Sequence, residues 1–224
     1  MPNWCYNCAT LKCPTLDTYK KVVDAIQKNL LFSTFVPLLS HNECDDDNNE
    51  GHNDDNECDD DNTEGHNDDN NIEGDDWIDV AYKKWGTKWE AQDIEIPHIN
   101  EETLEIHAYF DTAWGPPIAF YKTLHENENI DLTTYYYEAG MEFFGKFEYT
   151  DTSKIDESYS YPSDMEELEE LKDVIDDDMW CFMSCEWENL QELWEEEEEE
   201  DADQEIQEIE NEIQEAPEPQ PRQQ

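Results

Sequence analysis

Most of the acidic side chains of this chain lie in two segments, and this uneven distribution limits which residues can form a folded core. Residues 43–76 contain 17 Asp and Glu and no Lys or Arg, whereas residues 164–224 contain 26 Asp and Glu against one Lys and one Arg. These segments carry −41 of the formal net charge of −50, which leaves −9 for the other 129 residues. Since so many carboxylates leave little apolar surface to bury, most of the core must come from the remaining residues.

Hydrophobic periodicity in those residues predicts one α+β domain. Strands are expected at residues 4–12, 89–96, 104–112, 130–137 and 141–149. Helices are expected from about residue 15 to 31, over 79–85, and from Pro117 to about residue 124. This order predicts a ferredoxin-like sheet with two helices on one face. Both faces of the first strand have mixed polarity, so the face that it turns to the core stays open.

The predicted domain spans residues 1–149, and four segments interrupt or follow it. Residues 42–76 are predicted to be a disordered insert, because their two near-identical 14-residue repeats (43–56 and 57–70) contain almost no apolar side chain. Residues 150–163 are expected to be a linker, and residues 164–194 a helical extension with apolar side chains at spacings of three and four. Residues 195–224 are predicted to be an acidic, largely disordered tail.

Four sequence blocks occur along the chain in a recognisable order. They are MPNWCYN at 1–7, WGTKW at 85–89, TAWGPP at 112–117 and YYEAGMEFFG at 136–145. Together they resemble the YubB-type ferredoxin-like family, which is encoded by plasmids, phages and some large DNA viruses. The resemblance covers residues 1–42 and 77–149 and implies a βαββαβ core, usually with an added strand. It implies no reaction or ligand, and Gly115 stands where the family often has Ser.

Two of those blocks combine tryptophan with glycine and proline, and they define a predicted binding edge. Its residues are Trp85, Gly86, Trp89, Trp114, Pro116 and Pro117. One interpretation is a small tryptophan-rich core that holds two loops, because a buried indole needs apolar neighbours and a partner for its N–H. The other interpretation is a shared binding surface, since tryptophan is enriched where proteins bind partners.

Two further patterns have the spacing of metal ligands, but neither has the geometry. Cys5 and Cys8 are three residues apart on a predicted strand, so their side chains point to opposite faces and cannot share a zinc ion. The first repeat resembles a calcium-binding EF-hand loop, with ligand positions at Asp46, Asn48, Glu50, Asp54 and Glu57. The second copy has Asn71 in place of the final Glu, and no amphipathic helices flank either copy. We therefore predict no specific metal site and no cofactor, while weak binding of divalent cations by the repeats stays open.

No combination of residues indicates catalysis. The six histidines lie apart from one another, and the chain has no GxSxG, no phosphate-binding glycine loop and no HExxH. We therefore predict that the protein is not an enzyme. We expect an accessory or interaction protein of a mobile element or DNA virus that acts by binding. The alternative is an acidic nucleic-acid mimic, or a chaperone-like binder, that engages a basic protein through residues 43–76 and 164–215.

Charge and cysteine usage predict the partner and the compartment. The negative charge disfavours direct binding to nucleic acid or to an anionic membrane, and it favours a basic protein. The first residues have neither the basic nor the apolar region of a signal peptide, and no apolar run approaches the roughly 20 residues of a membrane span. Seven scattered cysteines are typical of reduced thiols. We therefore expect an intracellular protein, in the cytoplasm or nucleus of a host.

Overall fold

The computed structural model describes residues 3–38 and 76–215. The predicted insert, except for Asp76, and the last nine residues lie outside the described residues. The six strands form one sheet in the order β2-β3-β1-β4-β5-β6. Their bounds are β1 Trp4–Lys12, β2 Gln92–Asn100, β3 Glu105–Ala113, β4 Asp131–Glu138, β5 Phe143–Tyr149 and β6 Lys154–Ser160. The helices are α1 Leu16–Gln27, α2 Leu31–Phe35, α3 Asp76–Trp85, α4 Ile118–Glu128, α5 Met165–Lys172, α6 Asp177–Phe182 and α7 Ser184–Glu215.

Strand β1 lies between β3 and β4 and pairs antiparallel with both, so that Asn7 stands opposite Phe110 on one side and Tyr136 on the other. Helix α1 connects β1 to β2, and α4 connects β3 to β4. The order β2-β3-β1-β4 with these two crossings is the ferredoxin-like arrangement, and β5 and β6 extend the sheet beyond β4. The predicted α+β fold is therefore confirmed.

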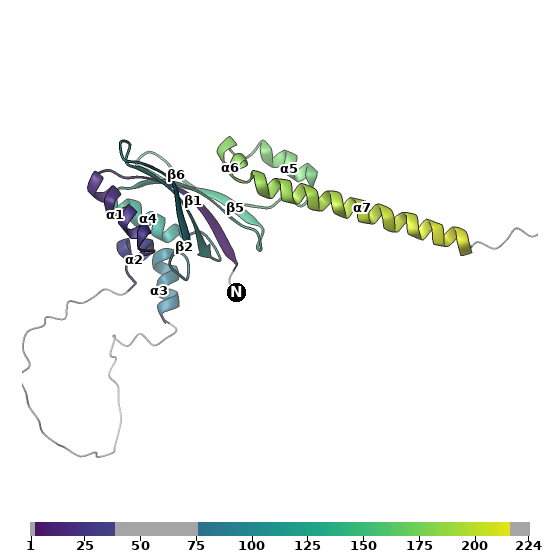
Figure 1. Ribbon diagram of the computed structural model, residues 1–224, viewed down its shortest axis with the longest axis horizontal. Coiled ribbons are helices and arrows are strands. Elements are labelled where there is room, and N and C mark those ends of the chain that lie inside the picture. Colours follow the sequence, from purple (N-terminus) through teal and green to yellow (C-terminus); the bar gives the residue numbers. More distant parts are fainter. Residues whose placement is uncertain (1–2, 39–75, 216–224) are drawn as a thin grey trace, which may run out of the picture. The chain divides into compact units, whose positions relative to one another are not determined.

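The helices of this domain cover one face of the sheet (Figure 1). The alternation of β1 turns Cys5, Asn7, Ala9 and Leu11 toward them, which settles the core face of that strand. The helices contribute buried side chains to the same core, namely Tyr19, Val22, Ala25 and Ile26 of α1, Phe32 of α2 and Phe120, Tyr121 and Leu124 of α4. The predicted sheet with helices on one face is thus observed, with α2 and α3 as shorter members of the helical layer.

The predicted helix over residues 15–31 is divided into α1 and α2. Asn29 has a left-handed backbone (φ +54°), which ends the first helix. The second helix begins at Leu31 because the Glu90 carboxylate accepts hydrogen bonds from the backbone N–H groups of Phe32 and Ser33. The cap comes from 57 residues further along the chain, so the local sequence does not indicate it.

The C-terminal part differs from its prediction in two places. Strand β6 lies inside the segment expected to be a linker, and only Ile155 and Tyr159 on it are half-buried, so its alternation is weak. Helix α7 continues through Glu215, although residues 195–224 were expected to be largely disordered. Its Glu, Gln and Ala residues favour helix strongly, and this propensity outweighs the mutual repulsion of the carboxylates.

The chain divides into two compact units, and their bounds differ from the domain end predicted at residue 149. The first comprises Met1–Glu142 and Lys146–Glu157, and the second comprises Phe143–Gly145 and Ser158–Gln224. The second unit has its own apolar centre, where Trp187 contacts the rings of Phe144, Tyr161 and Trp180. Across residues 3–38 and 76–215, no helix has both the length and the apolar character needed to cross a bilayer.

Candidate functional site

The structure brings together the two loops that contain the predicted edge. Gly86 follows α3 with φ +86°, and a Cβ at this position would lie 3.1 Å from the backbone nitrogen of Ile118 and 3.2 Å from that of Ala119. Beside it, the Thr87 hydroxyl donates a hydrogen bond to the Ala113 carbonyl at 2.8 Å. The loop after α3 therefore lies directly against the start of α4, and glycine is required for this close approach.

Some of the predicted edge residues are buried and others are accessible to solvent. Trp85 is buried, its indole N–H donates to the Val36 carbonyl at 2.7 Å, and its ring packs against Phe32. Pro117 is buried as well, immediately before α4. For these residues the interpretation as a small core is correct. Trp89 and Pro116 are half-buried, and Trp114 is 41% exposed, so these side chains are accessible to a partner.

Two tryptophans that the sequence reasoning left out of the edge lie beside it. Trp4 is 41% exposed and its ring centroid lies 6.1 Å from that of Trp89, while Trp77 is 37% exposed. Trp114 follows directly, because Trp4 pairs with Ala113 and the backbone N–H of Trp114 donates a hydrogen bond to the backbone carbonyl of Asn3 at 3.0 Å. We call the set of Trp4, Trp77, Lys88, Trp89 and Trp114 the tryptophan surface. Trp4 belongs to the first sequence block, and its place in that block is the sequence signal that could have assigned it to the edge.

Lys88 contacts two rings of the tryptophan surface. Its ammonium nitrogen is 5.0 Å from the centroid of the Trp89 ring and 6.0 Å from that of Trp77. Both distances fall within the range in which an indole face attracts a cation. The two rings are therefore arranged so that one positive charge contacts both of them.

Trp114 has an unusual backbone conformation. Its φ of +70° is uncommon for a residue with a side chain and costs about 1–2 kcal/mol. The flanking backbone is held by the Thr112 hydroxyl, which donates to the Gly115 carbonyl at 2.8 Å, and by the bond to Asn3. Strained residues that the surrounding structure holds in place cluster at functional sites, and the indole of this strained residue is 41% exposed.

A buried polar network fixes this loop to the sheet. The Asn7 amide nitrogen donates to the Cys5 carbonyl and to the Thr112 hydroxyl, both at 2.9 Å, and the Tyr121 hydroxyl donates to the Asn7 amide oxygen at 3.3 Å. Burial raises the pKa of Tyr121, so this hydroxyl stays a donor. The network joins β1, β3 and α4, and through the Thr112–Gly115 hydrogen bond it holds the loop that contains Trp114.

The cysteines do not form a metal site among the described residues. Cys5 faces the core and Cys8 faces the other side of the sheet, as the strand spacing predicts. Burial raises the pKa of Cys5, and it raises the pKa of Cys8 to about 11, so both remain neutral thiols near pH 7. The repeat ligands proposed for calcium, from Asp46 to Glu57, lie outside the described residues.

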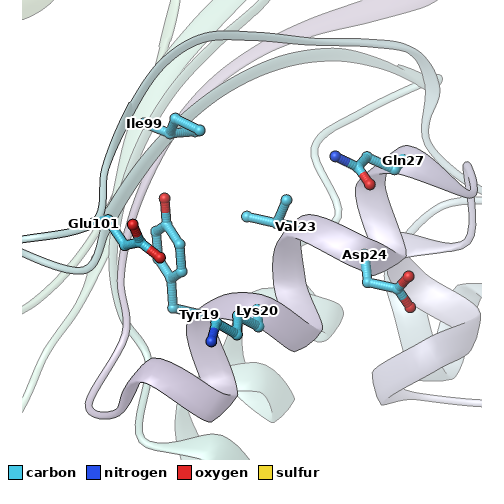
Figure 2. A pocket seen from close by; sticks show the side chains of 7 residues that line it. All are labelled: Tyr19, Lys20, Val23, Asp24, Gln27, Ile99 and Glu101. Carbon is cyan, nitrogen blue, oxygen red and sulfur yellow. The ribbon is translucent and has the colours of Figure 1, made fainter.

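A cavity of about 520 Å³ lies between α1 and the turn after β2. It is lined by Tyr19, Lys20, Val23, Asp24, Gln27, Ile99 and Glu101. Figure 2 shows Tyr19 and Glu101 close together at one end and Asp24 at the other. Its lining combines two apolar side chains with charges of both signs, and it contains neither a nucleophile paired with a base nor a set of metal ligands. This cavity therefore indicates no reaction.

Substitution of Gly86 tests whether the two loops depend on their close approach. Gly86→Ala is expected to lower the free energy of unfolding by about 1–3 kcal/mol, because alanine adds strain at positive φ and a contact with backbone atoms. Urea unfolding followed by circular dichroism measures this change. Gly115→Ala is the matched control, since a Cβ there meets nothing within 4 Å, and it should change stability by less than about 0.5 kcal/mol. Equal effects of the two substitutions would contradict the role assigned to Gly86.

Comparison with known families places this geometry in context. Residues 84–178 match the family described as the ferredoxin-like domain in Api92-like protein. The matched range runs from the end of α3 into α6, and it includes all six predicted edge residues but neither Trp4 nor Trp77. The searches of curated proteins and of solved structures returned no match. The family match and the sheet order together show that this chain contains a ferredoxin-like domain similar to that of Api92-like protein.

Proposed function

We propose that this protein acts by binding another protein rather than by catalysis, and that the tryptophan surface is its contact site. The observation that carries the proposal is the exposure of three indoles of the tryptophan surface, those of Trp4, Trp77 and Trp114. Trp is among the residue types that supply most of the energy at protein interfaces. An exposed apolar group of this kind beside polar residues is typical of an interaction site.

The partner that best fits this surface is a basic protein. The chain carries a net charge of −50, which attracts cationic partners over distances limited by ionic strength. Lys88 already lies over Trp89 and Trp77, so a cation of the partner would contact the exposed rings of Trp4 and Trp114 instead. In the proposed complex, arginine or lysine side chains of the partner lie over the exposed rings of Trp4 and Trp114.

The resemblance of four sequence blocks to the YubB-type family supports the cellular context that we propose. An accessory protein of a plasmid, phage or DNA virus acts inside the host cell, in its cytoplasm or nucleus. The thiols of Cys181 and Cys185 are exposed and free, as is usual in a reducing compartment. Both cysteines lie outside the ferredoxin-like sheet, so they support the compartment without bearing on the contact site.

The second candidate is the acidic mimic, and α7 is the observation that favours it. This helix has 32 residues, about 48 Å at 1.5 Å per residue. Glu195, Glu196 and Glu197 on it are exposed, as are Glu199 and Glu200. These carboxylates surround the helix at a rise of about 1.5 Å per residue along its axis, which is close to the charge spacing of about 1.7 Å along duplex DNA.

One binding experiment separates the two candidates. A synthetic arginine-rich peptide serves as the probe, and its affinity for the full chain is measured by fluorescence anisotropy at low and high salt. Trp4→Ala combined with Trp114→Ala is expected to weaken binding at least about tenfold at both salt concentrations, because lost ring contacts are not screened. Replacing Glu195, Glu196, Glu197, Glu199 and Glu200 of α7 by Gln should weaken binding mainly at low salt.

The control variant is Ile99→Ala, which removes an exposed apolar side chain (51% exposed) elsewhere on the same domain and should leave affinity unchanged. If the tryptophan variant binds like the unaltered chain while the glutamine variant loses binding, the acidic mimic is the correct function. If the tryptophan variant loses binding at both salt concentrations, the tryptophan surface is the contact site.

A further inference from the structure

Three metal-ligating side chains that are distant in sequence come together in the first unit. His125 lies in α4, Asp131 is the first residue of β4, and Asp151 lies in the turn between β5 and β6. The His125 Nδ1 atom is 3.5 Å from the Asp131 Oδ1 atom, and its Nε2 atom is 3.9 Å from the Asp151 Oδ1 atom. One ligand atom from each residue lies within 4.8 Å of the others. Since Asp131 pairs with Lys12, this cluster lies at the opposite end of β1 from Trp4.

The imidazole of His125 is held in the orientation that a metal ligand requires. Its Nδ1 atom is 3.0 Å from the Ile130 carbonyl oxygen, so this nitrogen carries the proton and donates it. The Nε2 lone pair is then left for a cation, and a backbone carbonyl behind the other ring nitrogen is typical of metal-bound histidine. The side chain is only 12% exposed and the Tyr149 ring packs edge-on at 4.7 Å, which fixes the ring.

An opening from solvent reaches the two carboxylates. A cavity of about 490 Å³ is lined by Asp131 and Asp151, together with Thr10, Lys12, Glu105, Leu132, Thr133, Thr150 and Thr152. Four threonine hydroxyls and the Glu105 carboxylate supply oxygen atoms that can hold water around an ion. The cluster is thus accessible to a hydrated cation, while the histidine that anchors it is not exposed.

We propose that His125, Asp131 and Asp151 form a binding site for a divalent cation of the zinc class. Zinc accepts one imidazole nitrogen and two carboxylate oxygens, and water completes the tetrahedron. Two ligands on one zinc ion lie about 3.4 Å apart. The Asp151 Oδ1 atom, 3.9 Å from Nε2, must therefore approach by about 0.5 Å, and the Asp131 carboxylate, which contacts the Nδ1 side of the ring, must turn toward the ion. Asp151 can make this movement, because its side chain is 87% exposed in a turn. A bound ion joins the β5–β6 turn to the end of α4, which makes the site structural.

The experiment is a titration of the full reduced chain with Zn²⁺ by calorimetry, repeated with Co²⁺ in an absorption spectrometer. We expect one equivalent to bind with nitrogen and oxygen ligands only, and therefore to give cobalt bands without thiolate-to-metal charge transfer. Cobalt captured by Cys44 or Cys58 of the repeats gives that charge-transfer band, so the two sites are distinguished in one spectrum.

Variants then assign the ligands. His125→Gln and Asp151→Asn are each expected to weaken binding of this equivalent at least about tenfold. Asp151 is so exposed that its substitution cannot prevent folding. The matched control is Asp156→Asn, an exposed carboxylate on β6 that is paired with Lys122 instead, and it should leave the equivalent in place. Unchanged Zn²⁺ affinity in both ligand variants, or cobalt spectra with thiolate bands alone, would overturn the proposal.

Discussion

Replacing Phe32 by alanine is expected to lower the free energy of unfolding by about 3–5 kcal/mol. The Phe32 side chain is fully buried, and its ring centroid lies 4.5 Å from that of Phe120, 5.6 Å from that of Trp85 and 6.1 Å from that of Phe110. It thereby joins α2, α3, α4 and β3. Its removal leaves a cavity that the rigid sheet behind it cannot fill, so both the buried area and the ring contacts are lost.

Urea unfolding followed by tryptophan fluorescence measures this loss, since Trp85 reports directly on the site. Phe35→Ala in the same short helix is the matched control. Phe35 is half-buried and its outer contact is the Lys21 ammonium, 4.3 Å from the ring centroid, so we expect a loss of about 1 kcal/mol. Similar losses for the two variants would show that α2 does not hold the core together through Phe32.

The second large effect is expected in the other unit, at Trp187. Its side chain is 3% exposed and packs edge-on against Phe144, with Tyr161 and Trp180 also in ring contact. Trp187→Ala should therefore lower the free energy of unfolding of this unit by about 3–5 kcal/mol. Its indole nitrogen is buried without a hydrogen-bond partner among the residues that the structure describes.

Because the indole nitrogen of Trp187 is unpaired, we expect phenylalanine at this position to lower the free energy of unfolding by less than alanine does. Trp187→Phe keeps an aromatic ring and removes a donor whose burial without a partner costs about 1–3 kcal/mol, so it should destabilise by less than about 2 kcal/mol. Circular dichroism at increasing urea resolves both variants, and Trp194→Ala, a half-buried tryptophan of the same helix, is the control. A phenylalanine variant as unstable as the alanine variant would show that the indole N–H is satisfied.

Much of the ferredoxin-like core could be predicted because its strands alternate clearly. The residues of β3 from Ile106 to Phe110 point alternately to the core and away from it, and the expected strand differs from the observed one by a single residue at each end. Strand β6 lacks this signal, because Asp156, Glu157 and Ser158 between its two half-buried residues are exposed. The pairing of β6 with its neighbour, rather than its own pattern, makes it a strand.

The tryptophan surface and the His125 cluster were likewise only partly predictable from the sequence. That the two tryptophan-containing blocks share one edge was predictable, but neither the contact of Gly86 with the start of α4 nor the exposure of each tryptophan was, because both depend on packing between distant segments. Trp85 and Trp89 are four residues apart, yet only Trp85 is buried. The grouping of His125 with Asp131 and Asp151 depends on where the β5–β6 turn lies, and single-sequence patterns carry no information on that position.

The polar contacts at the end of α3 have a consequence for protein engineering. The Lys84 ammonium donates hydrogen bonds to the carbonyls of Pro37 and Leu38, at 2.7 and 3.1 Å, and the neighbouring indole of Trp85 donates to Val36. Leu38 therefore lies next to the last turn of α3, the helix that begins at Asp76. A foreign domain whose own termini lie close together would fit between these two points, which makes them the natural place for a fluorescent reporter or for new chain ends in a circular permutant.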